Sequence, residues 1–62
     1  MKLNDKVRIN LSLWKGNIGT VSGIIERENC KDGDLVHVIF PETKINYAYQ
    51  HSFNSVDLIV IK

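Results

Sequence analysis

The sequence has little of what marks a secreted, metal-binding or membrane-spanning protein. It contains one cysteine, Cys30, which cannot form an internal disulfide, and no paired Cys or His spacing of the kind that zinc sites use. The N-terminus lacks the apolar stretch of a signal peptide, and the longest apolar run, LIVI, is far shorter than the roughly 20 residues that cross a bilayer. We therefore expect a cytoplasmic protein without membrane insertion.

A marked excess of one charge is also missing. Eight Lys and Arg stand against seven Asp and Glu, for a net charge of +1, whereas nucleic-acid-binding chains usually carry a clear basic excess. With one proline, no low-complexity run and 44% hydrophobic residues, the composition is that of a folded chain. Residues 1–62 form one domain, of a size that gains stability from a partner.

What the chain does contain is alternation of apolar and polar residues. Residues 6–13 alternate strictly, which predicts a half-buried β-strand. The corner WKGN at residues 14–17 then interrupts the pattern, and both Gly16 and Asn17 tolerate the positive φ of a tight connection. The side of this strand that we expect in the core consists of Val7, Ile9, Leu11 and Leu13.

The second expected strand, residues 18–28, is rich in β-branched residues and contains a glycine at position 23. A glycine within a strand usually marks a bulge or a bend, which a sheet that closes into a small barrel requires. If Gly23 is a bulge, Ile24 joins the core; if it is not, Ile25 does. The sequence leaves both open.

The remaining pattern adds three strands. Asp32 and Gly33 mark a hairpin turn within NCKDGD, and Pro41 ends the next apolar run. We expect strands at residues 35–40, 45–50 and 58–61, with a turn at 41–44 and one helical or 3₁₀ turn within 51–57. The prediction is an all-β fold, an SH3-like five-stranded antiparallel barrel with a single 3₁₀ turn before the last strand. The alternatives are an OB-fold, which usually needs a longer chain, and a three-stranded meander.

Two families resemble this sequence. The segments DKVRI at 5–9, WKG at 14–16 and IGTV at 18–21 resemble the KOW-type segment of ribosomal and transcription-elongation proteins. The same stretch, with VHVIF at 36–40 and later single positions, resembles the small SH3-like accessory proteins of electron transfer, photosystem I reaction-centre subunit IV and the ferredoxin-thioredoxin reductase variable chain. The longer NCKDGD hairpin and the absence of an asparagine-rich run depart from subunit IV. Both resemblances imply a docking module without catalysis.

No set of residues in the sequence indicates a catalytic or metal-binding site. A catalytic thiol needs a base within hydrogen-bond reach, and Cys30 lies in a polar turn. His37, His51 and Cys30 have no metal-ligand spacing, and Asp32 to Asp34 is only a fragment of a calcium loop. We expect no catalytic residue, no metal and no cofactor, so the chain is predicted not to be an enzyme.

The aromatic and basic residues are the candidates for a partner-binding surface. Trp14 lies at a corner, and Tyr47 and Tyr49 fall on one face of the expected fourth strand, where they either form an exposed platform or pack as part of the core. Basic residues beside them matter only if the fold gathers them on one side. The candidate partner-binding residues are Arg8, Trp14, Lys15, Asn17, Lys44, Tyr47 and Tyr49.

Two functions follow from these observations. The first is a small non-enzymatic module that docks on a protein partner or a multi-subunit complex, including the role of an electron-transfer accessory subunit. The alternative is a KOW-type module that binds nucleic acid, the ribosome or a transcription complex. Salt dependence of binding separates the two, because phosphate contacts release counterions.

Overall fold

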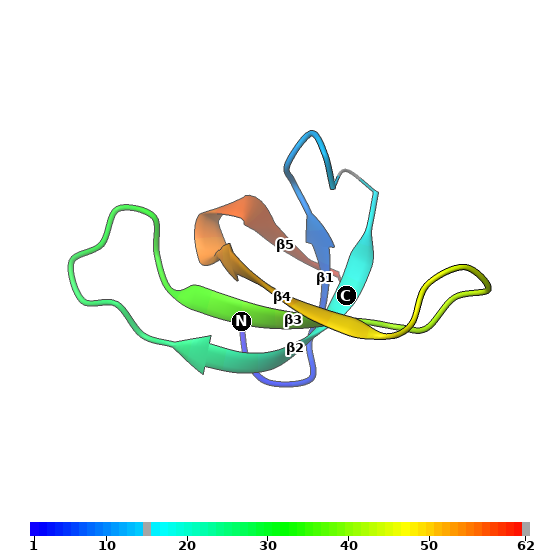
Figure 1. Ribbon diagram of the computed structural model, residues 1–62. Coiled ribbons are helices and arrows are strands. Elements are labelled where there is room, and N and C mark those ends of the chain that lie inside the picture. Colours follow the sequence, from blue (N-terminus) through cyan, green and yellow to red (C-terminus); the bar gives the residue numbers. More distant parts are fainter. Residues whose placement is uncertain (15, 62) are drawn as a thin grey trace.

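A computed structural model describes residues 1–14 and 16–61 of the chain. It contains five β-strands and a single 3₁₀ turn, η1, which confirms the all-β fold and the turn before the last strand (Figure 1). The elements in order are β1 (Lys6–Ile9), β2 (Ile18–Ile25), β3 (Leu35–Phe40), β4 (Tyr49–Asn54), η1 (Ser55–Asp57) and β5 (Leu58–Ile61). No helix in this part of the chain is long and apolar enough to cross a membrane.

All five strands belong to one antiparallel sheet. Its order is β4-β3-β2-β1-β5, so β1 to β4 form a meander and η1 returns the chain to the far side of β1. The sheet is not closed, since no hydrogen bonds pair its edge strands β4 and β5 within the described residues. Figure 1 shows β2 running first beside β1 and then, after a bend, beside β3.

The bend in β2 coincides with a β-bulge. The pairing of β2 with β3 shifts register between Val21 and Gly23. Ile24 consequently packs against the core, whereas Ile25 remains 49% exposed. The structure therefore selects the first of the two arrangements that the sequence left open, because the extra residue reverses which side chains point inward.

The core lies on the inner face of the coiled sheet. Every strand contributes to it, and in β1 and β3 the buried residues fall at alternate positions, as the period-2 pattern predicts. Leu11, Trp14, Ile24 and Val60 pack against its margin. The buried residues are Val7, Ile9, Val21, Val36, Val38, Phe40, Phe53 and Leu58.

The first strand is shorter than expected, and the prediction that Leu13 lies in the core is wrong. β1 ends at Ile9, the amide of Asn10 donates to the carbonyl of Asp57, and Leu13 is 93% exposed. A turn replaces the rest of the expected strand, with the amide of Trp14 donating to the carbonyl of Leu11 at 2.9 Å. The apolar and polar residues of the sequence therefore alternate beyond the end of β1. At that end, the hydrogen bond of Asn10 goes to η1 and not to a strand.

The corner also differs in detail. Gly16 has a φ of +91°, as expected, whereas Asn17 does not adopt positive φ. The amide of Asn17 instead donates to the carbonyl of Trp14 at 2.9 Å, which closes the corner.

The prediction of a strand at residues 45–50 is wrong. β4 begins at Tyr49, which pairs with Phe40, and it runs through the segment that was expected to break the alternation. Residues 41–48 form a projecting loop, here called the β3–β4 arm, in which Ile45 is 87% exposed and Tyr47 is 86% exposed. Hydrogen bonds between Thr43 and Asn46 close a turn inside this arm, so local turn formation prevails over strand pairing.

Candidate functional site

Five rings gather on the inner face of the sheet, along β4 and the end of β3. Phe40 comes from β3, and Tyr49, His51 and Phe53 come from alternate positions of β4, opposite the buried side chains of β3. Trp14 reaches them from the corner after β1. We call these five residues the aromatic cluster.

The rings of the aromatic cluster contact one another in ordered geometries. Trp14 lies stacked on Phe40, with centroids 5.6 Å apart, and Tyr49 lies stacked on Phe40 at 5.0 Å. His51 lies 4.9 Å from Trp14, and Phe53 meets the edge of Trp14 at an interplanar angle of 86°. Offset stacking and edge contacts of this kind hold aromatic side chains in defined orientations.

The cluster passes from buried to exposed across its width. Phe40 and Phe53 are 4% exposed, Trp14 is half-buried, and Tyr49 is 42% exposed. His51 is also exposed, and its Nδ1 lies 2.9 Å from the carbonyl oxygen of Ser52. Trp14 thus belongs to both alternatives that the sequence left open, because one side of the indole packs on the core and the rest borders an exposed aromatic surface.

A shallow hollow of about 300 Å³ adjoins the cluster. Phe40 and Tyr49 line it from the cluster, and Asn17 lines it from the corner. Pro41, Thr43 and Asn46 line it from the β3–β4 arm, and Gly16 and Ile18 line it from the corner and the start of β2. A concave surface therefore lies beside the exposed rings, and a side chain of a partner can enter it.

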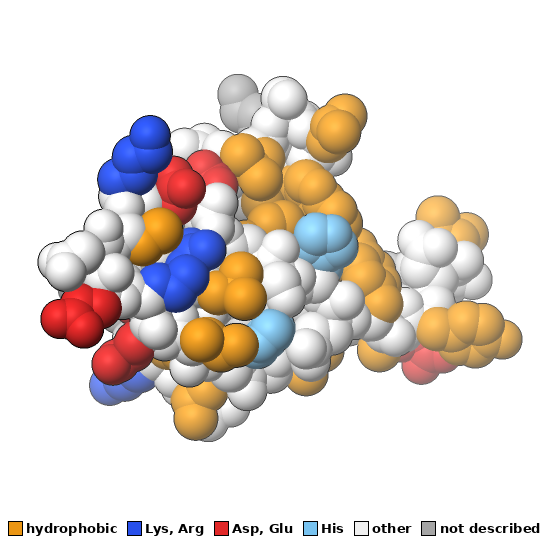
Figure 2. Space-filling view, turned by 60° about the vertical axis from the view of Figure 1, so that its left-hand side comes forward, with side chains coloured by type: hydrophobic (Ala, Val, Ile, Leu, Met, Phe, Trp, Pro, Cys, Tyr) orange, Lys and Arg blue, Asp and Glu red, His pale blue; other side chains and the backbone are white. Residues whose placement is uncertain are grey.

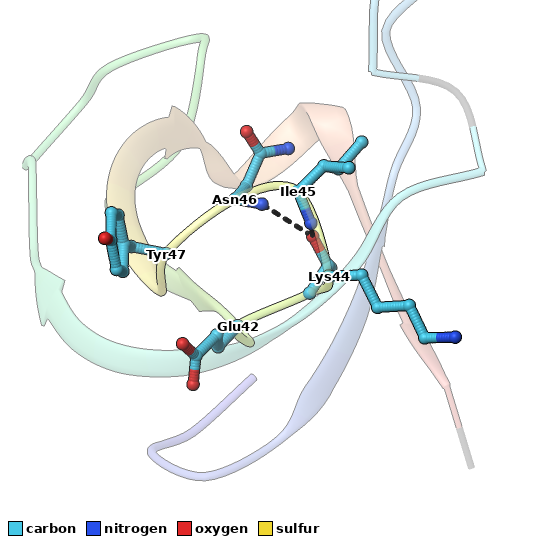
Figure 3. Close-up of a pocket in the computed structure, with 6 residues that line it drawn as sticks. Glu42, Lys44, Ile45, Asn46 and Tyr47 are labelled. Carbon is cyan, nitrogen blue, oxygen red and sulfur yellow. Dashed lines mark hydrogen bonds between the residues drawn. The ribbon is translucent and has the colours of Figure 1, made fainter.

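The β3–β4 arm carries a second hollow, of about 210 Å³, between Glu42 and Tyr47 (Figure 3). The amide of Asn46 donates to Thr43 Oγ1 at 3.0 Å and fixes the tip of the loop. Figure 3 shows Lys44 and Tyr47 directed to opposite sides of this loop. The two residues therefore do not share one surface.

Charged residues lie mostly away from the aromatic cluster. Residues 26–34, at the end of β2 and in the loop before β3, hold four of the seven acidic and two of the eight basic side chains. Figure 2 shows most of the charged side chains of that view gathered at one end of the molecule, a further acidic side chain at the opposite end, and a band of hydrophobic side chains beside a histidine between them. Among the described residues, this charged loop therefore lies apart from the exposed rings.

The structure brings only some of the predicted partner-binding residues together. Trp14 and Tyr49 are 6.5 Å apart by their centroids, and Asn17 borders the same hollow as Tyr49. Tyr47 and Lys44 lie on the β3–β4 arm, so the prediction that Tyr47 and Tyr49 share a strand face is wrong. Arg8 points outward from β1, on the other face of the sheet from the core. Lys15 lies outside the described residues.

Three members of the cluster were not among the predicted site residues: Phe40, His51 and Phe53. The pattern Tyr49-x-His51-x-Phe53 has the period of a strand. It would have placed His51 and Phe53 on the same strand face as Tyr49. Placing the fourth strand at residues 45–50 divided this pattern between a strand and a turn.

The residues weighed for metal binding do not converge. His51 lies on the inner face, whereas His37 faces outward and its Nδ1 lies 2.7 Å from Ser52 Oγ. Cys30 is half-buried in the β2–β3 loop, where its carbonyl accepts from the amide of Gly33. Among the described residues, no three His, Cys, Asp or Glu side chains are grouped closely enough to hold a metal ion.

Comparisons with protein-family models, with curated proteins and with solved structures found no match to this chain.

Proposed function

We propose that the chain is a small SH3-like module, without catalysis of its own, that docks on a protein partner or a multi-subunit complex through the aromatic cluster. The observation that supports it best is the exposure of Tyr49 and His51, whose rings pack on buried Phe40 and buried Phe53 respectively. Pre-ordered, partly exposed aromatic side chains beside a hollow are typical of the residues that dominate protein interfaces.

The strand order supports the SH3-like part of this proposal. A four-stranded antiparallel meander, a 3₁₀ turn and a fifth strand returning to β1 agree with the arrangement that the resemblance implies. The same resemblance implies attachment to a larger assembly, such as an electron-transfer complex. Ile45 and Tyr47 lie on the β3–β4 arm, the loop that leads into β4, and their exposed side chains add apolar area that a partner can cover.

The second candidate is a KOW-type nucleic-acid contact. Exposed rings of Tyr49 and His51 could stack on bases. Arg8, however, projects from the outer face of β1, away from the inner face that carries these rings. Because base stacking and phosphate binding need to act on one strand together, this separation favours the protein partner.

Affinity capture from a nuclease-treated extract of the producing cells tests the proposal. We expect a partner to be retained by the native protein, retained by the control Val56→Ala, and lost with Tyr49→Ala. Val56 is 58% exposed in η1 and lies outside the aromatic cluster, which makes it a matched surface change.

Fluorescence anisotropy with labelled RNA and DNA completes the test. If the protein elutes alone from the capture and binds these oligonucleotides with an affinity that falls steeply with salt, the nucleic-acid candidate replaces the protein partner. Retention of the same partner by Tyr49→Ala would contradict the role of the aromatic cluster.

A further inference from the structure

The charged residues of the sheet are unusually distributed. The five strands contain no Asp or Glu, and their two Lys and Arg residues are Lys6 and Arg8, both on β1. Both side chains are exposed, and they alternate with the fully buried Val7 and Ile9. The outer face of the sheet therefore carries two positive charges, two residues apart along one strand, or roughly 6.6 Å.

Isoleucines surround these two charges. Arg8 lies between Ile18 of β2 and Ile59 of β5 in the pairing register, and these side chains are 46% and 47% exposed. Lys6 lies between Thr20 and Ile61, and Thr20 in turn pairs with Ile39, which is 41% exposed. We call this surface the outer isoleucine patch, made of Lys6, Arg8, Ile18, Ile39, Ile59 and Ile61.

The patch is ordered and slightly hollowed. Lys6 Nζ donates to Thr20 Oγ1 at 2.8 Å, which holds the ammonium group against β2. Beside it, Ile18, Thr20, Ile39 and Pro41 line a hollow of about 350 Å³. A cation held at the rim of an aliphatic hollow presents a fixed charge next to an apolar contact area.

We propose that the outer isoleucine patch is a second docking surface, and that its occupant is a protein segment with two carboxylates set among aliphatic side chains. The carboxylates of such a segment complement Lys6 and Arg8. Its aliphatic side chains cover the isoleucines that flank these two charges. An amphipathic helix with two glutamates one turn apart, about 5–6 Å, meets the spacing along β1.

The charges and side chains of the patch favour this occupant over the others. A second copy packed by two-fold symmetry over the same patch brings Lys6 and Arg8 against their own counterparts, and like charges in an interface oppose association. The outward positions of the strands carry no Phe, Tyr or Trp, so the patch lacks the rings on which bases stack.

The two charges of this surface, Lys6 and Arg8, lie on the outer face of the sheet, whereas the rings of the aromatic cluster lie on the inner face. Ile18 and Ile39, at the edge of the patch, also line hollows that Tyr49 borders. A chain with both can hold two partners at once. The inference therefore adds a bridging role that the proposed function does not contain.

The test is an NMR titration of the ¹⁵N-labelled chain with a capped amphipathic helical peptide that carries two glutamates, one turn apart, within a leucine stripe. We expect saturable amide shifts centred on Lys6, Arg8 and Ile59, and no matching shifts at His51 and Phe53. One control peptide replaces the two glutamates by lysine, and another replaces the leucines by serine.

Charge reversal on the protein supplies the matched variants. Arg8→Glu should weaken binding of the glutamate peptide about tenfold, which corresponds to a lost charge contact of about 1.4 kcal/mol. Lys31→Glu, on the β2–β3 loop, should leave the affinity within about twofold of the native value. Arg8 and Lys31 are both exposed, so each variant should keep the dispersed spectrum of the native fold.

Three results would overturn the proposal: no shifts in the patch at millimolar peptide, equal binding of the lysine or serine peptide, or shifts in the patch produced by an oligonucleotide in place of the peptide. Concentration-dependent shifts in the patch without any peptide would assign it to self-association instead. Loss of partner capture by Tyr49→Ala with the peptide still bound would keep the two surfaces distinct.

Discussion

The indole of Trp14 lies stacked on the ring of Phe40, with centroids 5.6 Å apart and planes inclined by 22°. Trp14 comes from a corner outside any strand, and Phe40 is the last residue of β3. The contact therefore joins the turn after β1 to the opposite part of the meander. It also holds the buried side of the aromatic cluster on which Tyr49 rests.

Replacing Trp14 by alanine removes this stacking and the edge contact with Phe53. Because the indole is half-buried, we expect Trp14→Ala to lower the free energy of unfolding by about 2–3 kcal/mol, below the full cost of a buried tryptophan. Urea denaturation followed by circular dichroism measures the loss. Leu13→Ala is the control, since Leu13 is 93% exposed and should change stability by less than about 0.5 kcal/mol. Equal losses in the two variants would contradict the packing of Trp14.

Gly33 and Gly16 form a matched pair of positive-φ glycines. Their φ values are +79° and +91°, so alanine is strained at either position. A Cβ at Gly33 would collide with Ser55 Oγ, whereas a Cβ at Gly16 meets nothing within 4 Å. We expect Gly16→Ala to cost about 1 kcal/mol and Gly33→Ala at least about 1 kcal/mol more, since the second also disturbs the hydrogen bond from the amide of Asp34 to Ser55 Oγ. Thermal unfolding of both variants tests this order, and a smaller loss for Gly33→Ala would refute it.

Arg27 connects the β2–β3 loop to the end of β4. Its Nε donates to the carbonyl of Gly33 at 2.9 Å, and its Nη2 donates to Asn54 Oδ1 at 2.7 Å. Lysine keeps the charge, but its compact ammonium cannot reproduce the two-pronged geometry of the guanidinium. We expect Arg27→Lys to cost about 1–2 kcal/mol and to speed amide exchange in the loop. Lys31→Arg, at an exposed position of the same loop, is the control. Unchanged exchange in Arg27→Lys would show that these hydrogen bonds do not hold the loop.

The strands that consist of short apolar runs were predictable, because turn residues bound these runs and their length suits a strand rather than a helix. β3 and β5 have the expected bounds, and the glycine at position 23 correctly indicated an irregularity in β2. The errors came from segments in which alternation has another origin. Residues 10–13 and 45–48 alternate as strands do, yet turns hold both of them, and Leu13 and Ile45 face solvent.

The candidate site was predictable only in part, for the same reason. Trp14, Asn17 and Tyr49 could be selected from residue type and position at a corner or strand. Phe40, His51 and Phe53 join them through the β3–β4 register, which pairs Phe40 with Tyr49 and could not be fixed while the length of the loop between them was unknown.

By itself the sequence determined the all-β class, the antiparallel order of short strands and the 3₁₀ turn, since these depend on local alternation, turn residues and the spacing between them. Only the tertiary structure decided which rings meet and which charges share a face. The one-residue bulge between Val21 and Gly23 shifts the pairing of β2 with β3, and β1 ends at Ile9 rather than at Leu13. In a sheet, a shift of one residue moves a side chain to the opposite face. That geometry places Tyr49 with Trp14 on the inner face and Arg8 among isoleucines on the outer one.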